Sequence, residues 1–218
     1  MAKSFPNTGA TVIDTVADLP AASGALEGVM MFQKDTNELK ICDGASWISM
    51  LDTDTPPGLV HLNTTTISAS TWTIDNIFST TYRSYLLIFE YYATAANIVS
   101  MRLRTGGVAS STGYYMGGEL TNYVTASGAT VGNNNSAQWD ARIGHPDTSS
   151  NSRGSTVMTL TDPAYAVNTT VNGSYVDART NGSGGAFQGF HNVATAYDGF
   201  TFYGLTLTGV VSVYGYRN

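Results

Sequence analysis

Apolar and polar residues alternate with a period of two along much of this chain, and no stretch of helical length shows helical spacing. The closing stretch, residues 197–218, is the best example. Phe200 and Phe202 fall on one side of an extended chain there, whereas Thr201 and Tyr203 fall on the other. This alternation is the signature of a strand with one buried face. The pattern excludes a helical protein and favours an all-β one.

Two glycines, Gly204 and Gly209, interrupt the alternation in the closing stretch. A glycine inside a strand pattern marks a bulge or a bend, at which the chain can change face or switch sheet. We therefore expect residues 197–218 to form two antiparallel strands that complete a β-sandwich.

Further short strands are predicted, and turns rich in glycine and asparagine separate them. The candidate strands are 59–67, 72–78, 83–92, 98–104, 114–116, 120–124, 137–143, 156–160, 165–167 and 175–179, and the turns include 106–107, 132–136, 145–151, 172–173 and 181–185. Asn172-Gly173 favours a two-residue hairpin turn because both central positions tolerate positive φ. Many short strands of this kind predict a jelly-roll-like β-sandwich.

One predicted strand, residues 83–92, is apolar almost throughout. Such a strand has both faces covered. We expect the second sheet to cover one face and a neighbouring protein molecule to cover the other. Tyr85, Leu87 and Phe89 are therefore candidates for the core or for a trimer contact.

Two successive prolines and a glycine, residues 56–58, form a stiff linker. The predicted organisation is an N-terminal arm and β-meander over 1–55, a linker over 56–59 and a β-sandwich domain over 60–218. Asp52 and Asp54 precede the linker, but two carboxylates fall short of the roughly six to eight oxygen ligands that calcium takes. No metal site is predicted.

Charge is scarce and unevenly distributed. Only 12% of the residues are charged, which is about half the usual share, and the net charge is −6. Residues 1–60 hold eight acidic residues against three lysines, whereas residues 61–218 hold eight against seven arginines. Because phosphate binding requires clustered lysine and arginine, no nucleic-acid partner is expected. The acidic first part either docks on a basic surface or is simply a solvated acidic face.

The sequence contains no convincing catalytic or metal-binding motif. Metalloprotease, hydrolase, phosphate-loop and Cys-x-x-Cys patterns are missing. Cys42 is the only cysteine, and His61, His145 and His191 are far apart in loop-like contexts. We therefore predict a protein that is not an enzyme and has no cofactor. A pair of carboxylates brought together by folding could still cut glycosidic bonds, so a polysaccharide depolymerase is a remote alternative.

Targeting signals are also missing. No apolar run approaches the ~20 residues of a membrane-spanning helix, and the first residues lack the apolar core of a signal peptide. We expect synthesis in a cytoplasm and no membrane insertion.

Aromatic and amide side chains in the second part are candidates for exposed binding loops. All 13 tyrosines lie after residue 60. Such groups stack on sugars or fill protein interfaces, although packing in the core is the alternative for each aromatic. The candidates are Tyr114, Tyr115, Asn133, Asn134 and Trp139.

The closing stretch resembles the end of a jelly-roll-like domain in structural proteins of tailed bacteriophages. The similar segments are Tyr197-Asp198-Gly199-Phe200 and residues 207–217. Residues 72–85, with Phe78-Ser-x-x-Tyr82-x-x-Tyr85, are similar to the first half of that domain. Aromatic and glycine positions coincide over about residues 60–218, but no catalytic motif is shared.

The first part resembles a small module of phage tail fibres and related virion proteins. Three β-rich runs within residues 28–51 predict a meander. The Asp-Gly turn of that module places a tryptophan over the hairpin, although any β-meander with a core tryptophan would fit. The positions that carry the resemblance are Leu19, Gly28, Leu39, Asp43, Gly44 and Trp47.

These resemblances imply a virion protein displayed on a phage particle after synthesis in the host cytoplasm. The first expectation is a fibre or receptor-binding protein, attached through residues 1–55. The alternative is a decoration or cement protein that stabilises the capsid. Expected partners are other tail or capsid proteins, two further copies in a homotrimer, and a host surface polysaccharide or protein.

Overall fold

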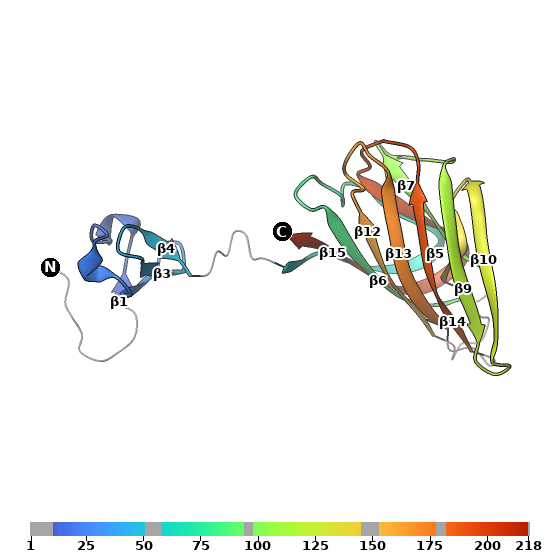
Figure 1. Cartoon of the computed structure of the whole chain (residues 1–218), viewed down its shortest axis with the longest axis horizontal. Helices are drawn as coiled ribbons and strands as arrows, with labels where there is room; N and C mark the ends of the chain where they lie inside the picture. Colours follow the sequence, from blue (N-terminus) through green and yellow to red (C-terminus); the bar gives the residue numbers. More distant parts are fainter. Residues whose placement is uncertain (1–10, 51–57, 94–97, 145–152, 178–181, 218) are drawn as a thin grey trace. The chain divides into compact units, whose positions relative to one another are not determined.

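The computed structural model describes residues 11–50, 58–93, 98–144, 153–177 and 182–217. The chain divides into two compact units, residues 1–56 and residues 57–218. The smaller unit contains one four-stranded sheet and the larger unit contains one eleven-stranded sheet (Figure 1). The protein is all-β, with a large curled antiparallel sheet and a small separate sheet.

The smaller unit is the meander that its sequence predicts, preceded by one additional strand. Its strands are β1 (Thr11–Ile13), β2 (Met30–Gln33), β3 (Glu38–Cys42) and β4 (Trp47–Ser49), in that spatial order. β1 is parallel to β2 and the other pairs are antiparallel. Two single-turn 3-10 helices, Val16–Asp18 and Gly24–Leu26, connect β1 to β2. Met31 and Cys42 are buried, which gives this unit a very small core.

The larger unit begins with a strand of 17 residues and ends with its longest strand, of 19 residues. Its strands are β5 (Gly58–Ile74), β6 (Ser84–Ala93), β7 (Val99–Thr105), β8 (Val108–Ala109), β9 (Tyr114–Asn122), β10 (Ser127–Ser136), β11 (Trp139–Gly144), β12 (Gly154–Thr161), β13 (Thr169–Asp177), β14 (Ser183–His191) and β15 (Gly199–Arg217). The spatial order is β10-β9-β14-β13-β12-β6-β15-β7-β11, and β5 and β8 pair with β15 and β7.

Strand β15 turns this sheet into a sandwich. Residues 199–203 pair with β7, residues 207–216 pair with β6, and β5 follows β15 along both parts. The sheet thereby curls (Figure 1). Strand β11, which among the described residues pairs with β7 alone, consequently packs against β9, β10, β13 and β14. Two layers of one sheet face each other, and the fold is β-sandwich-like.

The prediction of two antiparallel strands over residues 197–218 is therefore wrong. The chain makes no hairpin there. It remains extended and changes partner between Tyr203 and Leu207, in the segment that contains Gly204. Gly209 causes no switch, because it pairs in register with both Ile67 and Tyr91.

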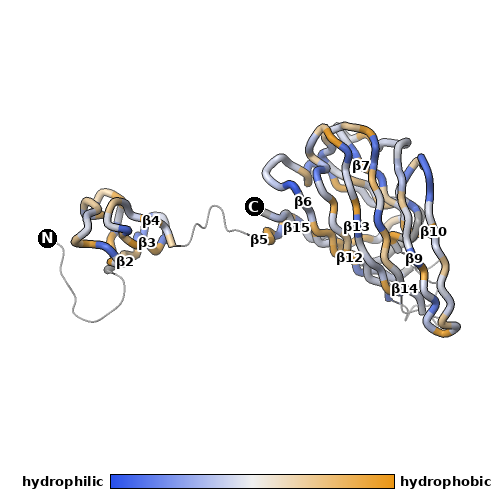
Figure 2. The backbone as a smooth tube through the Cα atoms, in the orientation of Figure 1, coloured by the Kyte–Doolittle hydropathy of each residue, from blue (hydrophilic) through white to orange (hydrophobic). Residues whose placement is uncertain are grey.

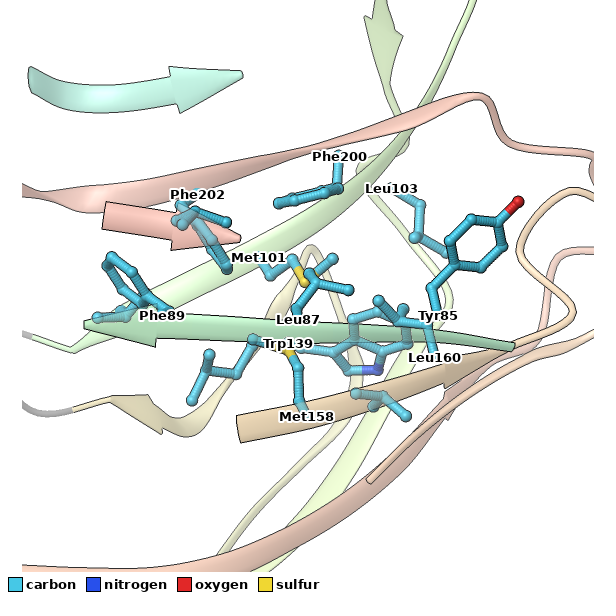
Figure 3. Close-up of a cluster of buried hydrophobic side chains, with 14 of the residues drawn as sticks. Tyr85, Leu87, Phe89, Met101, Leu103, Trp139, Met158, Leu160, Phe200 and Phe202 are labelled. Atoms are coloured by element: carbon cyan, nitrogen blue, oxygen red, sulfur yellow. The ribbon is translucent and has the colours of Figure 1, made fainter. Parts of the chain in front are cut away.

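The core lies between the two layers. Figure 3 shows side chains from β6, β7, β11, β12 and β15 gathered in one cluster. Aromatic stacking is prominent: the ring of Phe202 stacks on Phe89 with centroids 5.0 Å apart, and Phe200 stacks on Phe78 at 5.7 Å. Tyr85, Leu87 and Phe89 are fully buried in this cluster, so of the two roles predicted for them they have the core role.

The second face of β6 is only partly covered by the described residues. Leu86 and Ile88 are partly exposed and Glu90 is exposed, because strand alternation turns them away from the core. The neighbouring molecule expected on this face stays a prediction.

Several predicted strand boundaries are wrong. Residues 59–67 and 72–78 do not form two strands, because β5 continues unbroken through residues 68–71 and ends at Ile74. Residues 165–167 form bends instead of a strand, and the Tyr165 hydroxyl donates to the backbone carbonyl of Thr80 at 2.8 Å. The predicted turn at 181–185 is wrong for residues 183–185, which belong to β14. The predicted turn at 145–151, Asn181, and Asp52 and Asp54 lie outside the described residues.

Two predicted turns are strand interiors. Asn172-Gly173 lies in the middle of β13 and residues 132–136 belong to β10. Gly173 is needed for packing: a Cβ added there would lie 2.6 Å from Cζ of Phe187 on β14. The aromatic ring of a neighbouring strand thus occupies the place of the missing side chain.

Candidate functional site

The outer face of strands β10, β9, β14 and β13 carries exposed aromatic and polar side chains. Register places Tyr115 of β9 beside Phe190 of β14, and Gly117 beside Gln188. Because side chains alternate along a strand, these residues point outward and Tyr114, Met116 and His191 point into the core. Figure 2 shows that much of this part of the sheet is neither strongly hydrophobic nor strongly hydrophilic.

A groove of about 450 Å³ lies on this outer face. We call it the aromatic groove; its lining includes Tyr115, Gly117, Asn133, Thr170, Gln188 and Phe190. Two further hollows adjoin it along β9, one of about 280 Å³ that shares Gly117 and Gln188, and one of about 310 Å³ beside Glu119. The outer face of the sheet therefore has three adjoining hollows, one of which is lined by the aromatic residues Tyr115 and Phe190.

Tyr115 and Phe190 stack on each other across two strands. Their ring centroids are 4.7 Å apart and the ring planes differ by 5°. Phe190 is 41% exposed, and the Tyr115 hydroxyl accepts a hydrogen bond from Nδ2 of Asn192 at 3.4 Å. The two rings pack face to face, so the pair presents a continuous aromatic surface.

Glycine gives the aromatic groove its depth. A Cβ added at Gly117 would meet no atom within 4 Å, so this position opens directly into the groove. Its partner on β10 is Gly132, which also has no side chain. A Cβ at Gly132 would lie 3.0 Å from the backbone carbonyl oxygen of Met116, so the open position beside Tyr115 is Gly117.

Beneath the groove the aromatic pair rests on a rigid buried cluster. Trp139 of β11 is fully buried, and its Nε1 donates to the backbone carbonyl of Phe190 at 3.3 Å. The rings of Tyr114 and Trp139 meet edge to face at 5.1 Å, and burial raises the pKa of Tyr114. Because β11 belongs to the opposite layer, Trp139 ties the strand that carries Phe190 to the other side of the sandwich.

His191 is also part of the buried cluster. Its Nε2 donates to the backbone carbonyl of Thr112 at 2.9 Å, and its Nδ1 accepts from the backbone N–H of Val193 at 3.4 Å and lies 3.2 Å from the Tyr197 hydroxyl. This pattern satisfies the neutral imidazole with its proton on Nε2. Burial lowers the pKa of His191.

We predict that the sandwich loses stability as the pH falls below about 6.5, the ordinary pKa of histidine. The unfolded chain binds a proton on His191 at that pH and the folded chain does not, so acid favours the unfolded state. Urea unfolding of the wild type and of His191→Gln at pH 7.5 and 5.5 measures the effect. The wild type should lose more stability between these pH values than the variant; equal losses would contradict the prediction.

The structure corrects the predicted binding loops. All five candidates lie on strands, and Tyr114 and Trp139 are fully buried core residues. Tyr115 lines the aromatic groove. Asn133 also lines it but is partly buried, and its Nδ2 donates to the carbonyl of Gln138 at 3.2 Å. Asn134 is exposed on β10.

Phe190, Gln188 and Gly117 were not predicted from the sequence. Phe190 and Gln188 lie in the glycine-rich residues 183–191, where no strand was expected. The histidines differ from prediction too, because His61 is on β5 and His191 on β14, while His145 lies outside the described residues.

The candidate attachment residues lie close together in the smaller unit. Oδ1 of Asp43 accepts the backbone N–H groups of Ala45 at 2.8 Å and Ser46 at 2.6 Å, which lowers the pKa of Asp43. Gly44 has φ +91°, a conformation that favours glycine. This turn pairs Trp47 with Cys42 across the β3–β4 hairpin.

The side chain of Trp47 links two segments of the smaller unit but is only partly buried. Its Nε1 donates to the backbone carbonyl of Pro20 at 2.8 Å, which ties the hairpin to the preceding segment. Leu19 and Leu39 are also partly buried, and Gly28 donates its N–H to the carbonyl of Cys42 at 2.8 Å with φ +81°.

In the described parts of the chain, no helix has the length and apolar character needed to cross a bilayer. The same residues include no group of three or more histidine, cysteine, aspartate or glutamate side chains placed to hold a metal ion. Comparison with protein-family models, with curated proteins and with solved structures finds no match to this chain.

Proposed function

We propose that this chain is a non-enzymatic structural protein of a tailed-bacteriophage particle, displayed on the particle surface as a fibre or receptor-binding protein. The observation that carries the proposal is the aromatic groove, a continuous aromatic surface on the outer face of a unit that is separate from the smaller one. The resemblance of both units to phage virion proteins supports it.

The two units have different tasks in this proposal. The meander of residues 1–55 attaches the protein to other virion proteins of the tail or capsid, and the sandwich carries the groove that meets a polysaccharide or protein on the host surface. The charge difference between the two parts suits this division, since the acidic residues concentrate in the attaching part.

A homotrimer is part of the proposal. The partly exposed Leu86 and Ile88 of β6 adjoin Val157 of β12, which is 43% exposed. These aliphatic side chains offer apolar area that two further copies can cover. Sedimentation of the purified chain measures the oligomeric state, and a stable monomer at micromolar concentration would contradict a trimer.

The same aliphatic surface favours a second candidate function, a decoration or cement protein of the capsid. In that case Leu86, Ile88 and Val157 would lie against neighbouring coat subunits and stabilise the head.

Immunogold labelling of purified particles, with an antibody against this chain, tests the proposal. We expect label on the tails, and we expect purified chain added to host cells first to slow adsorption of the particles. Label on heads without any effect on adsorption would support the decoration function instead. Particles that carry no label would overturn both.

A further inference from the structure

We propose that the aromatic groove is a binding site for a neutral saccharide, whose sugar ring lies against Tyr115 and Phe190. The inference rests on the proposed function and specifies the ligand class of that site. The groove, at about 450 Å³, is within the range of about 300–1,000 Å³ that small-molecule sites occupy.

The aromatic pair supplies the apolar contact. Because the two rings stack on each other, each covers one face of its partner, and the remaining faces look towards the flanking strands β10 and β13. An aromatic face is electronegative and attracts the polarised C–H groups on the apolar side of a pyranose ring. Two residues along β9 from Tyr115, Gly117 leaves room for that ring, because a Cβ added there would meet no atom within 4 Å.

Polar groups at the rim match sugar hydroxyls. Gln188 and Thr170 are exposed, and their side chains have no hydrogen-bond partner among the described residues. An amide offers two donors and one acceptor, and a hydroxyl offers both roles, so each can pair with a sugar hydroxyl that donates and accepts. These groups fix a sugar's orientation over the rings.

The lining of the aromatic groove has no charged side chain among its described residues, and this favours neutral ligands over charged ones. An anionic uronic acid or sialic acid would find no arginine or lysine in the lining, and a cationic amino sugar would find no carboxylate in it, since Glu119 lines the adjoining hollows and not the groove. A neutral hexose needs neither. The lining therefore favours neutral saccharides over charged ones.

Gly117→Val is the sharpest test. A Cβ at this position would meet no atom within 4 Å, so the valine side chain can enter the groove without a clash at its Cβ, and valine suits a strand better than glycine. The full chain is applied to an array of neutral, uronic-acid, sialylated and amino-sugar oligosaccharides, and the affinity for the best neutral one is then measured by calorimetry. We expect Gly117→Val to weaken this binding at least tenfold with no fall in melting temperature.

Three further variants locate the site. Phe190→Ala should also weaken binding at least tenfold, whereas Tyr115→Phe, which keeps the ring, should weaken it less. Ser68→Val adds a side chain of similar size at an exposed outward position of β5, at the far edge of the sheet, and should leave affinity unchanged.

Several outcomes would overturn the inference. These are no binding to any neutral oligosaccharide, selective binding of charged ones, or binding that Gly117→Val leaves intact. If purified chain still slows adsorption of the particles in that case, the proposed function stands and the host contact is a protein or lies elsewhere. If neutral sugars bind as expected but the particles lack the protein, the site stands and the proposed function fails.

Discussion

Replacing Trp139 with alanine is expected to lower the free energy of unfolding of the sandwich by about 3–5 kcal/mol. The indole is fully buried, meets Tyr114 edge to face, and donates to the carbonyl of Phe190 in the opposite layer. Its removal leaves a cavity and an unpaired acceptor at the contact between two layers. Because domains are typically stable by only about 5–15 kcal/mol, this loss is a large share. Urea unfolding followed by circular dichroism measures it.

Two variants separate the causes of that loss. Trp139→Phe keeps an aromatic ring but removes the N–H donor, and should cost less than the alanine variant. Trp72→Ala removes the same side chain from a partly exposed position on β5, where it contacts Phe200 and Phe202, and should also cost less. If Trp72→Ala proves equally destabilising, burial at β11 is not what makes Trp139 important.

The sequence predicts strands well where one face is apolar and poorly where glycine replaces side chains. β6, β7, β12 and the meander of the smaller unit lie close to their predicted positions. Residues 132–136 of β10 and 183–185 of β14 were expected to be turns, because Asn and Gly are turn residues in isolation. In the folded chain these glycines make room for aromatic neighbours: the side chain of Tyr123 lies where a Cβ on Gly184 would be, as Phe187 does at Gly173.

Which strands pair is harder to predict from the sequence than where each strand lies. β5 opens the larger unit and β15 closes it, yet they pair along almost their whole lengths. Period-two alternation says which residues share a face, but the partner depends on how the whole sheet curls. The sequence of β15 has the pattern of two strands although it forms one. Its first part, residues 199–203, pairs with β7, and its second part, residues 207–216, pairs with β6.

The aromatic groove could be predicted only in part for the same reason. Tyr114 and Tyr115 are identical in type and adjacent, so alternation places them on opposite faces without saying which face is buried. Only the packing of Tyr114 against Trp139 decides this. Phe190 and Gln188 then join Tyr115 through the β9–β14 register, which no local pattern reveals.

Replacing Trp47 with alanine is expected to unfold the smaller unit and to remove the protein from particles. The indole is only partly buried, so we expect a loss of about 3 kcal/mol, at the low end for a tryptophan. The hydrogen bond to Pro20 is lost as well. A unit this small is only marginally stable, so we expect this loss to unfold it. Limited proteolysis should cut residues 1–56 readily while the sandwich resists, and quantitative mass spectrometry of virions should find at least tenfold less protein.

The matched control is Ile48→Ala, on the same strand but 47% exposed. It should leave both proteolysis and incorporation close to wild type, because little apolar area is buried there. The decisive comparison, for Trp47→Ala, is between the folding of the smaller unit and the incorporation of the protein into virions. Virions that carry Trp47→Ala at the wild-type level, although its residues 1–56 are cleaved readily, would place attachment in the sandwich. The aliphatic side chains Leu86, Ile88 and Val157 on its outer face would then be the next candidates for contact with the particle.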